Sequence, residues 1–222
     1  MGVTGFKQID MLVGIIPRDW IVEFYGDEKL VHILLHHTLA YQSRFGKVLL
    51  YHTLDFGGLN PYLLQRLARI LGGDIDEVMV SRGFRLGDVV EGLRSIEARD
   101  DYRSLIVAYP YHHPSSNSMI YRVATEITGI IKRISSRGRR VILFNSVSRF
   151  GKYYPDGGNY HHHTVHVIIR LVRRRNGRGV AEVFKHPWKP RGSRTVFYVD
   201  SLIGWSSWGG QRLLSEWLYI RS

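Results

Sequence analysis

The sequence predicts an α/β fold with a mostly parallel central sheet, helices on both faces and antiparallel strands toward the C-terminus. Two observations lead to this prediction. Between residues 20 and 146, apolar runs of strand length alternate with amphipathic helical patterns. Continuous apolar strands between such helices are typical of a parallel sheet that is covered on both faces. After residue 160, strands follow one another across short turn signals, which extends the sheet in antiparallel order.

The parallel part is read in chain order from strand and helix patterns. A β-branched and aromatic strand at Ile21–Tyr25 ends at Gly26, and an apolar helix begins near Leu30. The apolar positions of the last predicted helix of this part recur at helical spacing. The remaining predicted elements are a strand at Lys47–Thr53, a helix at Pro61–Leu71, a strand at Glu77–Arg82, a helix at Leu86–Ile96, a strand at Ser104–Tyr109, a helix at Met119–Ser135 and a strand at Arg140–Ser146.

The C-terminal part is predicted to contain three strands and one short helix. The strands are Thr164–Arg175, Gly179–His186 and Arg194–Asp200. Asn176-Gly177 and the turn at 190–192 join them, because Gly, Asn and Pro at these points favour tight turns. The helix is predicted at Gln211–Ile220.

Length and composition exclude several classes of protein. The 222 residues are enough for one large domain with a substantial core. The absence of cysteine excludes disulfides, thiolate metal sites and cysteine nucleophiles. No apolar run reaches the ~18 residues of a membrane span, and the N-terminus lacks a secretory pattern. We therefore expect a cytoplasmic protein.

The net charge of +12 is concentrated in the C-terminal part of the chain. Residues 1–129 carry 13 Lys/Arg and 15 Asp/Glu, whereas residues 130–222 carry 18 Lys/Arg and 4 Asp/Glu. Such asymmetry indicates contact with a polyanion, and grouped basic residues favour nucleic acid. The alternative is a solvated surface on which arginine serves stability.

The strand and helix around Gly26 have the outline of a nucleotide-binding unit without its phosphate chemistry. In the G-x-x-x-x-G-K-[ST] frame counted from Gly26, the second Gly is Val31, the Lys is His32 and the Ser/Thr is Ile33. The missing Lys would bind the terminal phosphates and the missing hydroxyl would bind Mg²⁺. A β-branched Val also resists the backbone angles that Gly allows. Taken alone, these residues fit a strand and helix that never bound nucleotide.

Several segments, taken in order, resemble the core ATPase domain of the RecA/RadA recombinase superfamily, nearest to archaeal and eukaryal recombinases and their paralogues. They are TGFKQIDMLVG at the start, IVEFYG with the loop frame and HTLA, ILGGDIDEVMVSRGF, SLIVAY, the glycine pair at 157–158 and KHPWKP. The resemblance runs from about Thr4 to Val199. It implies one RecA-like three-layer core domain over residues 1–222, with residues 200–222 as an extension. We expect no separate N-terminal DNA-binding domain.

This resemblance also exposes what the chain lacks. The family's second nucleotide motif ends in a metal-binding Asp, where this chain has Ala108. Asp55 is the best counterpart of the family's catalytic glutamate, at a spacing that differs by about one residue. Hydrolysis needs charge neutralisation and positioning of the γ-phosphate. We therefore predict a pseudo-ATPase with a degenerate nucleotide site, no catalytic residues and no cofactor.

Two loops in this fold family face DNA, and the resemblance places them at residues 109–117 and 147–163. The first carries His112 and His113. The second is suited to single strands, since cations contact phosphates and aromatic rings stack on bases. Its candidate residues are Arg149, Phe150, Lys152, Tyr153, Tyr154 and Tyr160. The alternative is a tyrosine-rich loop that packs on the sheet.

Two further basic clusters are candidates for phosphate contact. Arg173, Arg174 and Arg175 flank a predicted turn, where they form either a phosphate patch or a solvated hairpin end. Lys185 and Lys189 belong to the second cluster, which also includes His186, Arg191 and Arg194.

The histidines allow a metal-site hypothesis, which we do not favour. His161, His162, His163 and His166 lie close together in sequence, but tight zinc sites usually add a carboxylate or thiolate. Consecutive residues on a strand also point to opposite faces, so the three adjacent histidines could not all converge. We therefore predict no metal site, and expect these side chains to be polar groups of a DNA loop or an interface.

The sequence thus predicts a catalytically inactive recombinase paralogue. We expect it to bind DNA, with single strands favoured, and to modulate homologous recombination or DNA repair near the nucleoid. A full-length recombinase or another paralogue is the expected protein partner, and no membrane is expected. One alternative is a non-catalytic scaffold subunit of a recombinase or other complex. Another is a metal-dependent enzyme that uses the histidines.

Overall fold

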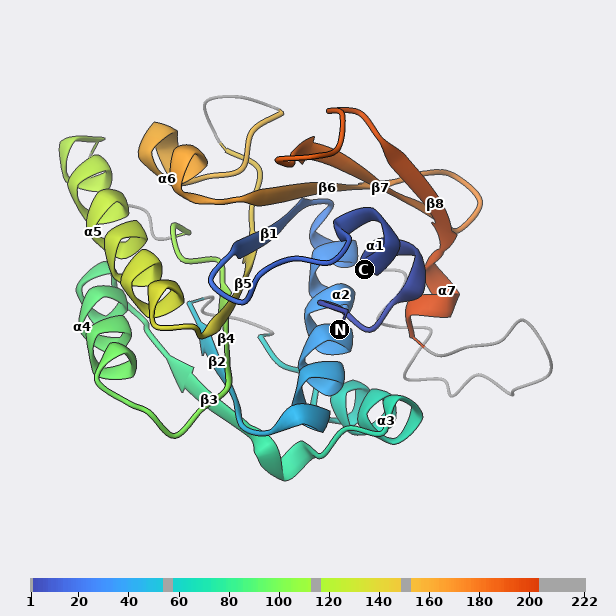
Figure 1. The fold of residues 1–222 in the computed structure, drawn as a ribbon, viewed down its shortest axis with the longest axis horizontal. Helices are drawn as coiled ribbons and strands as arrows, with labels where there is room; N and C mark the ends of the chain where they lie inside the picture. Colours follow the sequence, from blue (N-terminus) through green and yellow to red (C-terminus); the bar gives the residue numbers. More distant parts are fainter. Residues whose placement is uncertain (1, 54–57, 113–116, 149–152, 204–222) are drawn as a thin grey trace.

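The sheet contains eight strands in the order β3-β2-β4-β5-β1-β6-β7-β8. A computed structural model describes residues 2–53, 58–112, 117–148 and 153–203 (Figure 1). Strands β1 to β6 pair in parallel, and β6, β7 and β8 pair antiparallel. The strands are β1 (Ile21–Gly26), β2 (Val48–His52), β3 (Val78–Arg82), β4 (Ser104–Ala108), β5 (Arg140–Asn145), β6 (Val167–Arg173), β7 (Arg178–Lys185) and β8 (Arg194–Tyr198).

Helices cover both faces of the sheet, as Figure 1 shows. One core contains apolar residues of α1, α2, α3 and α7, together with side chains from alternate positions of the strands. The other core lies under α4 and α5, and α6 packs beside α5. The helices are α1 (Lys7–Val13), α2 (Glu28–Gln42), α3 (Pro61–Leu71), α4 (Leu86–Glu97), α5 (Asn117–Ser136), α6 (Gly158–Thr164) and α7 (Val199–Leu202). Two short 3-10 helices lie at Ser43–Phe45 and Ile75–Glu77.

Helix α2 is the central helix of the first core, and polar side chains on it fasten the start of the chain. The His37 ring bonds to the Thr4 carbonyl at 2.9 Å, and Gln42 donates to the Val3 carbonyl at 2.6 Å. The Asp10 carboxylate of α1 accepts the N–H groups of Val3 and Thr4. Each buried polar group on this side of α2 thus meets a backbone partner, which makes its burial affordable.

The predicted α/β architecture is confirmed, including its order of strands and helices and its antiparallel end. Two expectations about the chain between 158 and 166 are wrong. Residues Gly158–Thr164 form α6, and β6 begins at Val167, where we predicted a loop that leads into a strand at Thr164. Gly157 and Gly158 have φ values of 115° and 75°, which let the chain turn sharply into this helix. The adjacent histidines therefore lie on a helix.

Two other predicted features have different outcomes. Helix α1 has no counterpart among the predicted elements. The predicted helix at Gln211–Ile220 lies outside the described residues. Within the described part of the chain, no helix combines the length and apolarity needed to cross a membrane.

Candidate nucleic-acid interface and the degenerate nucleotide frame

The junction of β1 and α2 leaves no room for a phosphate loop. Asp27 alone separates the strand from the helix, which begins at Glu28. The N–H groups that a phosphate would need are bonded within the protein. Asp27 donates to the Leu171 carbonyl at 2.9 Å, Leu30 donates to the Asp27 carboxylate at 3.0 Å, and Val31 donates to the Asp27 carbonyl at 2.9 Å. A carboxylate therefore occupies the positive end of this helix, where a nucleotide-binding fold would place a phosphate.

The frame positions themselves belong to the core or to α2. Val31 is fully buried in the first core, and Ile33 packs against the same core. A Cβ atom at Gly26 would lie 2.1 Å from the Leu171 carbonyl oxygen, so this glycine allows close packing of β1 against β6. Ala108 ends β4 and is fully buried, with no carboxylate for a metal. Asp55 lies outside the described residues.

Imidazole and phenol rings gather beside the frame. The rings of His32 and His36 are 4.4 Å apart, and those of His52 and Tyr109 are 6.1 Å apart. Tyr109 follows Ala108, is 4% exposed and has a φ of 58°, which is unusual for a residue with a side chain. Bulky side chains thus fill the end of the sheet at which a RecA-like enzyme would hold metal and phosphate.

The hydrogen bonds of His36 define its protonation state. Its Nδ1 lies 2.8 Å from the His32 carbonyl and donates to it, while its Nε2 accepts the Asn60 N–H at 2.8 Å. Only the neutral tautomer with a proton on Nδ1 satisfies both bonds. Burial lowers the pKa of His36 to about 3, and the nearby His32 lowers it further. Burial, followed by the charge of Arg82, lowers the pKa of His52 to about 4. Neutral rings cannot replace the permanent charge of a phosphate-binding lysine.

The sheet face beyond β1 carries a second cluster, which we call the arginine–aromatic recess. It has a volume of about 250 Å³ and is lined by Tyr153, Arg170, Glu182, Val183, Phe184 and Arg191. The Arg170 guanidinium lies 4.9 Å from the centre of the Tyr153 ring, and that of Arg191 lies 4.5 Å from the centre of the Phe184 ring. Rings flanked by guanidinium groups offer both stacking surfaces and phosphate contacts.

Contacts with the sheet position the tyrosines of this recess. The Tyr25 hydroxyl donates to the Tyr153 carbonyl at 2.7 Å, and burial raises the pKa of Tyr25 so that it remains a donor. The Tyr154 ring packs edge-on against Phe184 at 5.3 Å. Tyr153 is still 61% exposed and Tyr154 48% exposed. These side chains are therefore held in place while their ring faces remain available.

A buried polar network supports the loop from the opposite side. The Glu23 carboxylate accepts Asn145 Nδ2 at 2.7 Å and lies 2.9 Å from His161 Nε2. The other ring nitrogen of His161 lies 2.8 Å from the Tyr111 hydroxyl. Asn145 also donates to the Asp156 carbonyl at 2.8 Å. This network joins β1, β5 and α6, and it fixes the end of the 147–157 segment.

The predicted DNA-binding residues separate into three groups. Tyr153 and Tyr154 line or border the recess, while Tyr160 on α6, His112 and the trio Arg173, Arg174 and Arg175 are exposed elsewhere. Lys185 and Lys189 hold backbone: Lys185 donates to the carbonyls of His162, His163 and Val165, and Lys189 donates to that of Met11. Arg149, Phe150, Lys152 and His113 lie outside the described residues.

Three side chains of the recess were absent from our predicted site, namely Arg170, Phe184 and Arg191. Arg170 is opposite Glu182 in the register of β6 with β7, and Phe184 lies two residues further along the same face. The sequence holds one indication of them, since Arg170 interrupts the apolar run of a predicted strand.

The histidines near α6 point in different directions. His161 is buried in the network with Glu23, and His162 bonds to the Pro155 carbonyl at 3.2 Å. The ring of His166 stacks on Trp20 at 5.3 Å and accepts the Ile21 N–H. His163 is exposed. Among the described residues, no three His, Asp or Glu side chains converge on a common metal position.

One solved structure is similar to this chain over most of its length. It is described as the crystal structure of the RadB recombinase, and it matches with a TM-score of 0.71 and 18% sequence identity. The match covers 89% of this chain and 96% of that chain. No protein-family model and no curated protein matches the sequence. The likeness confirms the RecA-like fold that the sequence predicts.

Proposed function

We propose that this protein is a catalytically inactive RecA-like recombinase paralogue that binds single-stranded DNA. The arginine–aromatic recess is the observation that carries this proposal. It combines exposed rings, which stack on any base, with guanidinium groups that contact phosphates. The similarity to a RadB recombinase supports a role in recombination or repair, with DNA and a full-length recombinase as partners.

The absence of catalysis is proposed from the nucleotide frame. Hydrolysis requires a cation on the terminal phosphates and a carboxylate that holds Mg²⁺. His32 and Ala108 occupy those two positions, and Asp27 places a negative charge at the start of α2. We expect no Mg²⁺-dependent ATP turnover. Turnover that is lost on changing His32 would contradict this part of the proposal.

DNA binding is tested with a labelled single-stranded oligonucleotide over a series of salt concentrations. Loss of one stacking ring in Tyr153→Ala should weaken binding roughly 5- to 150-fold, since stacking contributes about 1–3 kcal/mol per base. Arg170→Gln should reduce both affinity and the slope of log K against log salt, because one phosphate contact is removed. Tyr62→Ala on α3 is the matched control, since Tyr62 is also exposed but lies away from the recess.

The outcome that would reject the DNA site is equal affinity and salt slope in Tyr153→Ala, Arg170→Gln and the unchanged protein. A double variant, Arg149→Gln with Lys152→Gln, tests the loop predicted from sequence in the same assay. Double-stranded and RNA oligonucleotides of the same sequence measure the expected preference for single-stranded DNA.

A scaffold function is the second candidate, and an exposed apolar edge favours it. Val80 of β3 is 45% exposed and Phe84 just beyond it is 61% exposed. β3 is an edge strand, and such an edge can accept a strand from another protein. If this function holds, Val80→Lys should abolish a complex with a full-length recombinase in gel filtration and leave DNA affinity unchanged. Complex formation that survives Val80→Lys would argue against this edge as the contact.

A further inference from the structure

A second recess lies at the opposite edge of the parallel sheet, where strands β2, β4 and β5 begin. Its volume is about 500 Å³. We call it the basic recess because five of its nine lining residues are cationic, namely Arg18, Lys47, Arg103, Arg137 and Arg139. The nucleotide frame and the predicted DNA loops follow the carboxyl ends of the strands, so they do not contribute to it.

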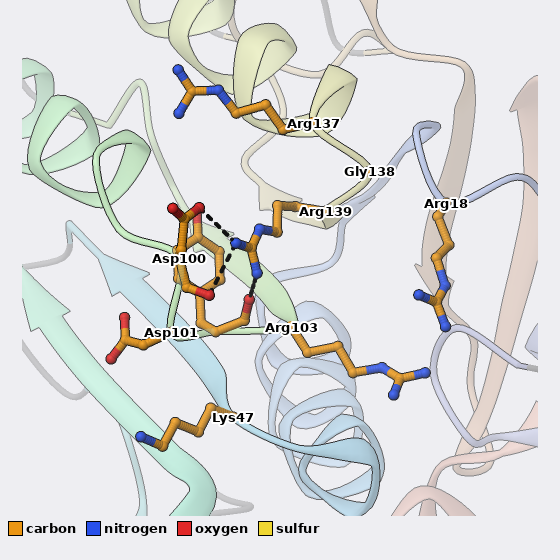
Figure 2. A pocket seen from close by; sticks show the side chains of 9 residues that line it. Arg18, Lys47, Asp100, Asp101, Arg103, Arg137, Gly138 and Arg139 are labelled. Atoms are coloured by element: carbon orange, nitrogen blue, oxygen red, sulfur yellow. Dashed lines mark hydrogen bonds and ion pairs between the residues drawn. The ribbon is translucent and has the colours of Figure 1, made fainter.

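The two acidic residues of the basic recess are already paired on one side of it. Asp100 accepts Arg139 at 2.9 Å, and Asp101 accepts Arg99 at 2.7 Å. In Figure 2, Asp100 and Asp101 lie together on one side, whereas the Arg103 and Arg18 side chains lie on the other side with their guanidinium ends toward each other. The recess is thus polarised, with an excess of positive charge around Arg18 and Arg103.

Arg18 and Arg103 are placed differently in this pair. Arg18 is exposed and forms no ion pair with another described residue. Arg103 is half-buried, and its Nη1 donates to the Phe45 carbonyl at 3.0 Å, which fixes the direction of the side chain. A guanidinium held in this way keeps its remaining N–H groups for an acceptor in the recess.

Arg140 provides an independent observation at the same edge. It is the first residue of β5, its side chain is 7% exposed, and its Nη1 is buried with no hydrogen-bond partner among the described residues. Burial lowers the pKa of Arg140, and the positive charges of Arg18 and Arg103 lower it further. A buried guanidinium without an acceptor is costly, because it has lost its water and gained no counter-charge.

No acidic side chain compensates Arg140 with a direct ion pair. Asp10 is the only carboxylate that favours its charge, and Asp10 accepts four hydrogen bonds from the Val3, Thr4 and Gly5 backbone and the Thr4 hydroxyl. Three guanidinium groups therefore lie within electrostatic range of one another with too little negative charge between them. An anion from solution would supply it.

We propose that Arg18, Arg103 and Arg140 form a phosphate-binding site at the amino-terminal edge of the sheet. Guanidinium groups suit a tetrahedral dianion, because their forked N–H groups bond to two oxygens at once. The ligand carries a phosphate group, either as a free phosphate or phosphomonoester or as part of a nucleic-acid backbone. This site goes beyond the proposed function and does not depend on it.

The test measures unfolding temperature against inorganic phosphate, with chloride at equal ionic strength as the reference. A ligand that binds only the folded protein raises this temperature in a concentration-dependent manner. The apparent Kd for phosphate is expected to rise at least about tenfold in Arg18→Gln and in Arg103→Gln, since each removes a charged hydrogen-bonding group. Arg69→Gln, an exposed arginine of α3 outside the recess, should keep the Kd of the unchanged protein.

Arg140→Met provides a second variant that separates binding from folding. Removing a buried charge without a partner should leave the phosphate-free protein at least as stable as before, while the response to phosphate is lost. A response to phosphate no greater than that to chloride would overturn the proposal. The same conclusion follows if Arg18→Gln, Arg103→Gln and Arg140→Met all respond as the unchanged protein does.

The source of the phosphate group is found by repeating the comparison with a labelled single-stranded oligonucleotide. If Arg18→Gln weakens both ligands, the site takes a nucleic-acid backbone. If it weakens inorganic phosphate alone, the site takes a free phosphate or a phosphomonoester. Tyr153→Ala distinguishes the two DNA questions, because it should weaken the oligonucleotide and leave the inorganic phosphate Kd unchanged.

Discussion

Acid should destabilise this protein through His36, which joins α2 to α3. The ring accepts the N–H of Asn60, the N-cap residue of α3, and its other nitrogen donates to the His32 carbonyl. A second proton would turn the accepting nitrogen into a donor that faces another donor. Protonation of His36 therefore breaks the bond to Asn60 and leaves a charge in a fully buried position.

The magnitude follows from the difference between the two pKa values. His36 titrates near 6.5 when unfolded, and burial lowers its pKa to about 3 in the folded state. The unfolded chain therefore binds more protons between these values. The stabilising contribution is complete above about pH 6.5 and is lost as pH falls toward 3, at about 1.4 kcal/mol per pH unit. At pH of about 5, His36 alone should lower the free energy of unfolding by roughly 2 kcal/mol.

Urea unfolding near neutral pH and at about pH 5 measures this contribution in a difference between proteins. His36→Gln does not titrate here, and its amide oxygen can still accept the Asn60 N–H. The variant should lose about 2 kcal/mol less than the unchanged protein between the two pH values. His163→Gln on α6 controls for the loss of an exposed histidine, and its loss should match that of the unchanged protein. Equal losses in His36→Gln and the unchanged protein would refute the reasoning.

Three further changes test the frame and α6. Asp27→Ala removes the N-cap bond to Leu30 and should lower the free energy of unfolding by about 1 kcal/mol, measured in urea. Replacing residues 31–33 by Gly-Lys-Thr should not create binding of a fluorescent ATP analogue, because α2 already begins at Glu28; micromolar binding would contradict this. Lys185→Met removes three bonds to carbonyls near the end of α6, so amide hydrogen exchange should become faster in α6 and remain unchanged in α3.

The alternation of strands and helices could be predicted because it depends on local patterning. Apolar runs such as Ser104–Ala108 and the helical spacing within Asn117–Ser136 are visible without tertiary information. Helices α1 and α6 depend on contacts from distant residues. Asp10 holds the turn before α1, and Lys185 bonds to carbonyls at the end of α6, so neither short segment has a sufficient local signal.

The candidate site could be predicted only in part, for the same physical reason. The nucleotide frame is contiguous in sequence, so the loss of its lysine and hydroxyl is evident from His32 and Ile33 alone. The arginine–aromatic recess instead unites Arg170, Phe184 and Arg191, which come from separate strands and a turn. Their convergence follows from strand register, and a register between distant segments leaves little trace in local spacing.

The state of the β1–α2 junction also explains why ligand sites should lie elsewhere on this fold. In an open α/β sheet, ligands enter at the carboxyl ends of the strands, where helix N-termini offer unbonded N–H groups. Here Asp27 takes those groups, and Val31 and Tyr109 join the same buried core as Phe24. Reopening the crevice would remove core contacts before any phosphate contact could form. Binding is therefore more readily gained at surfaces outside this core, such as the antiparallel extension with Arg170 and the amino-terminal edge with its uncompensated arginines.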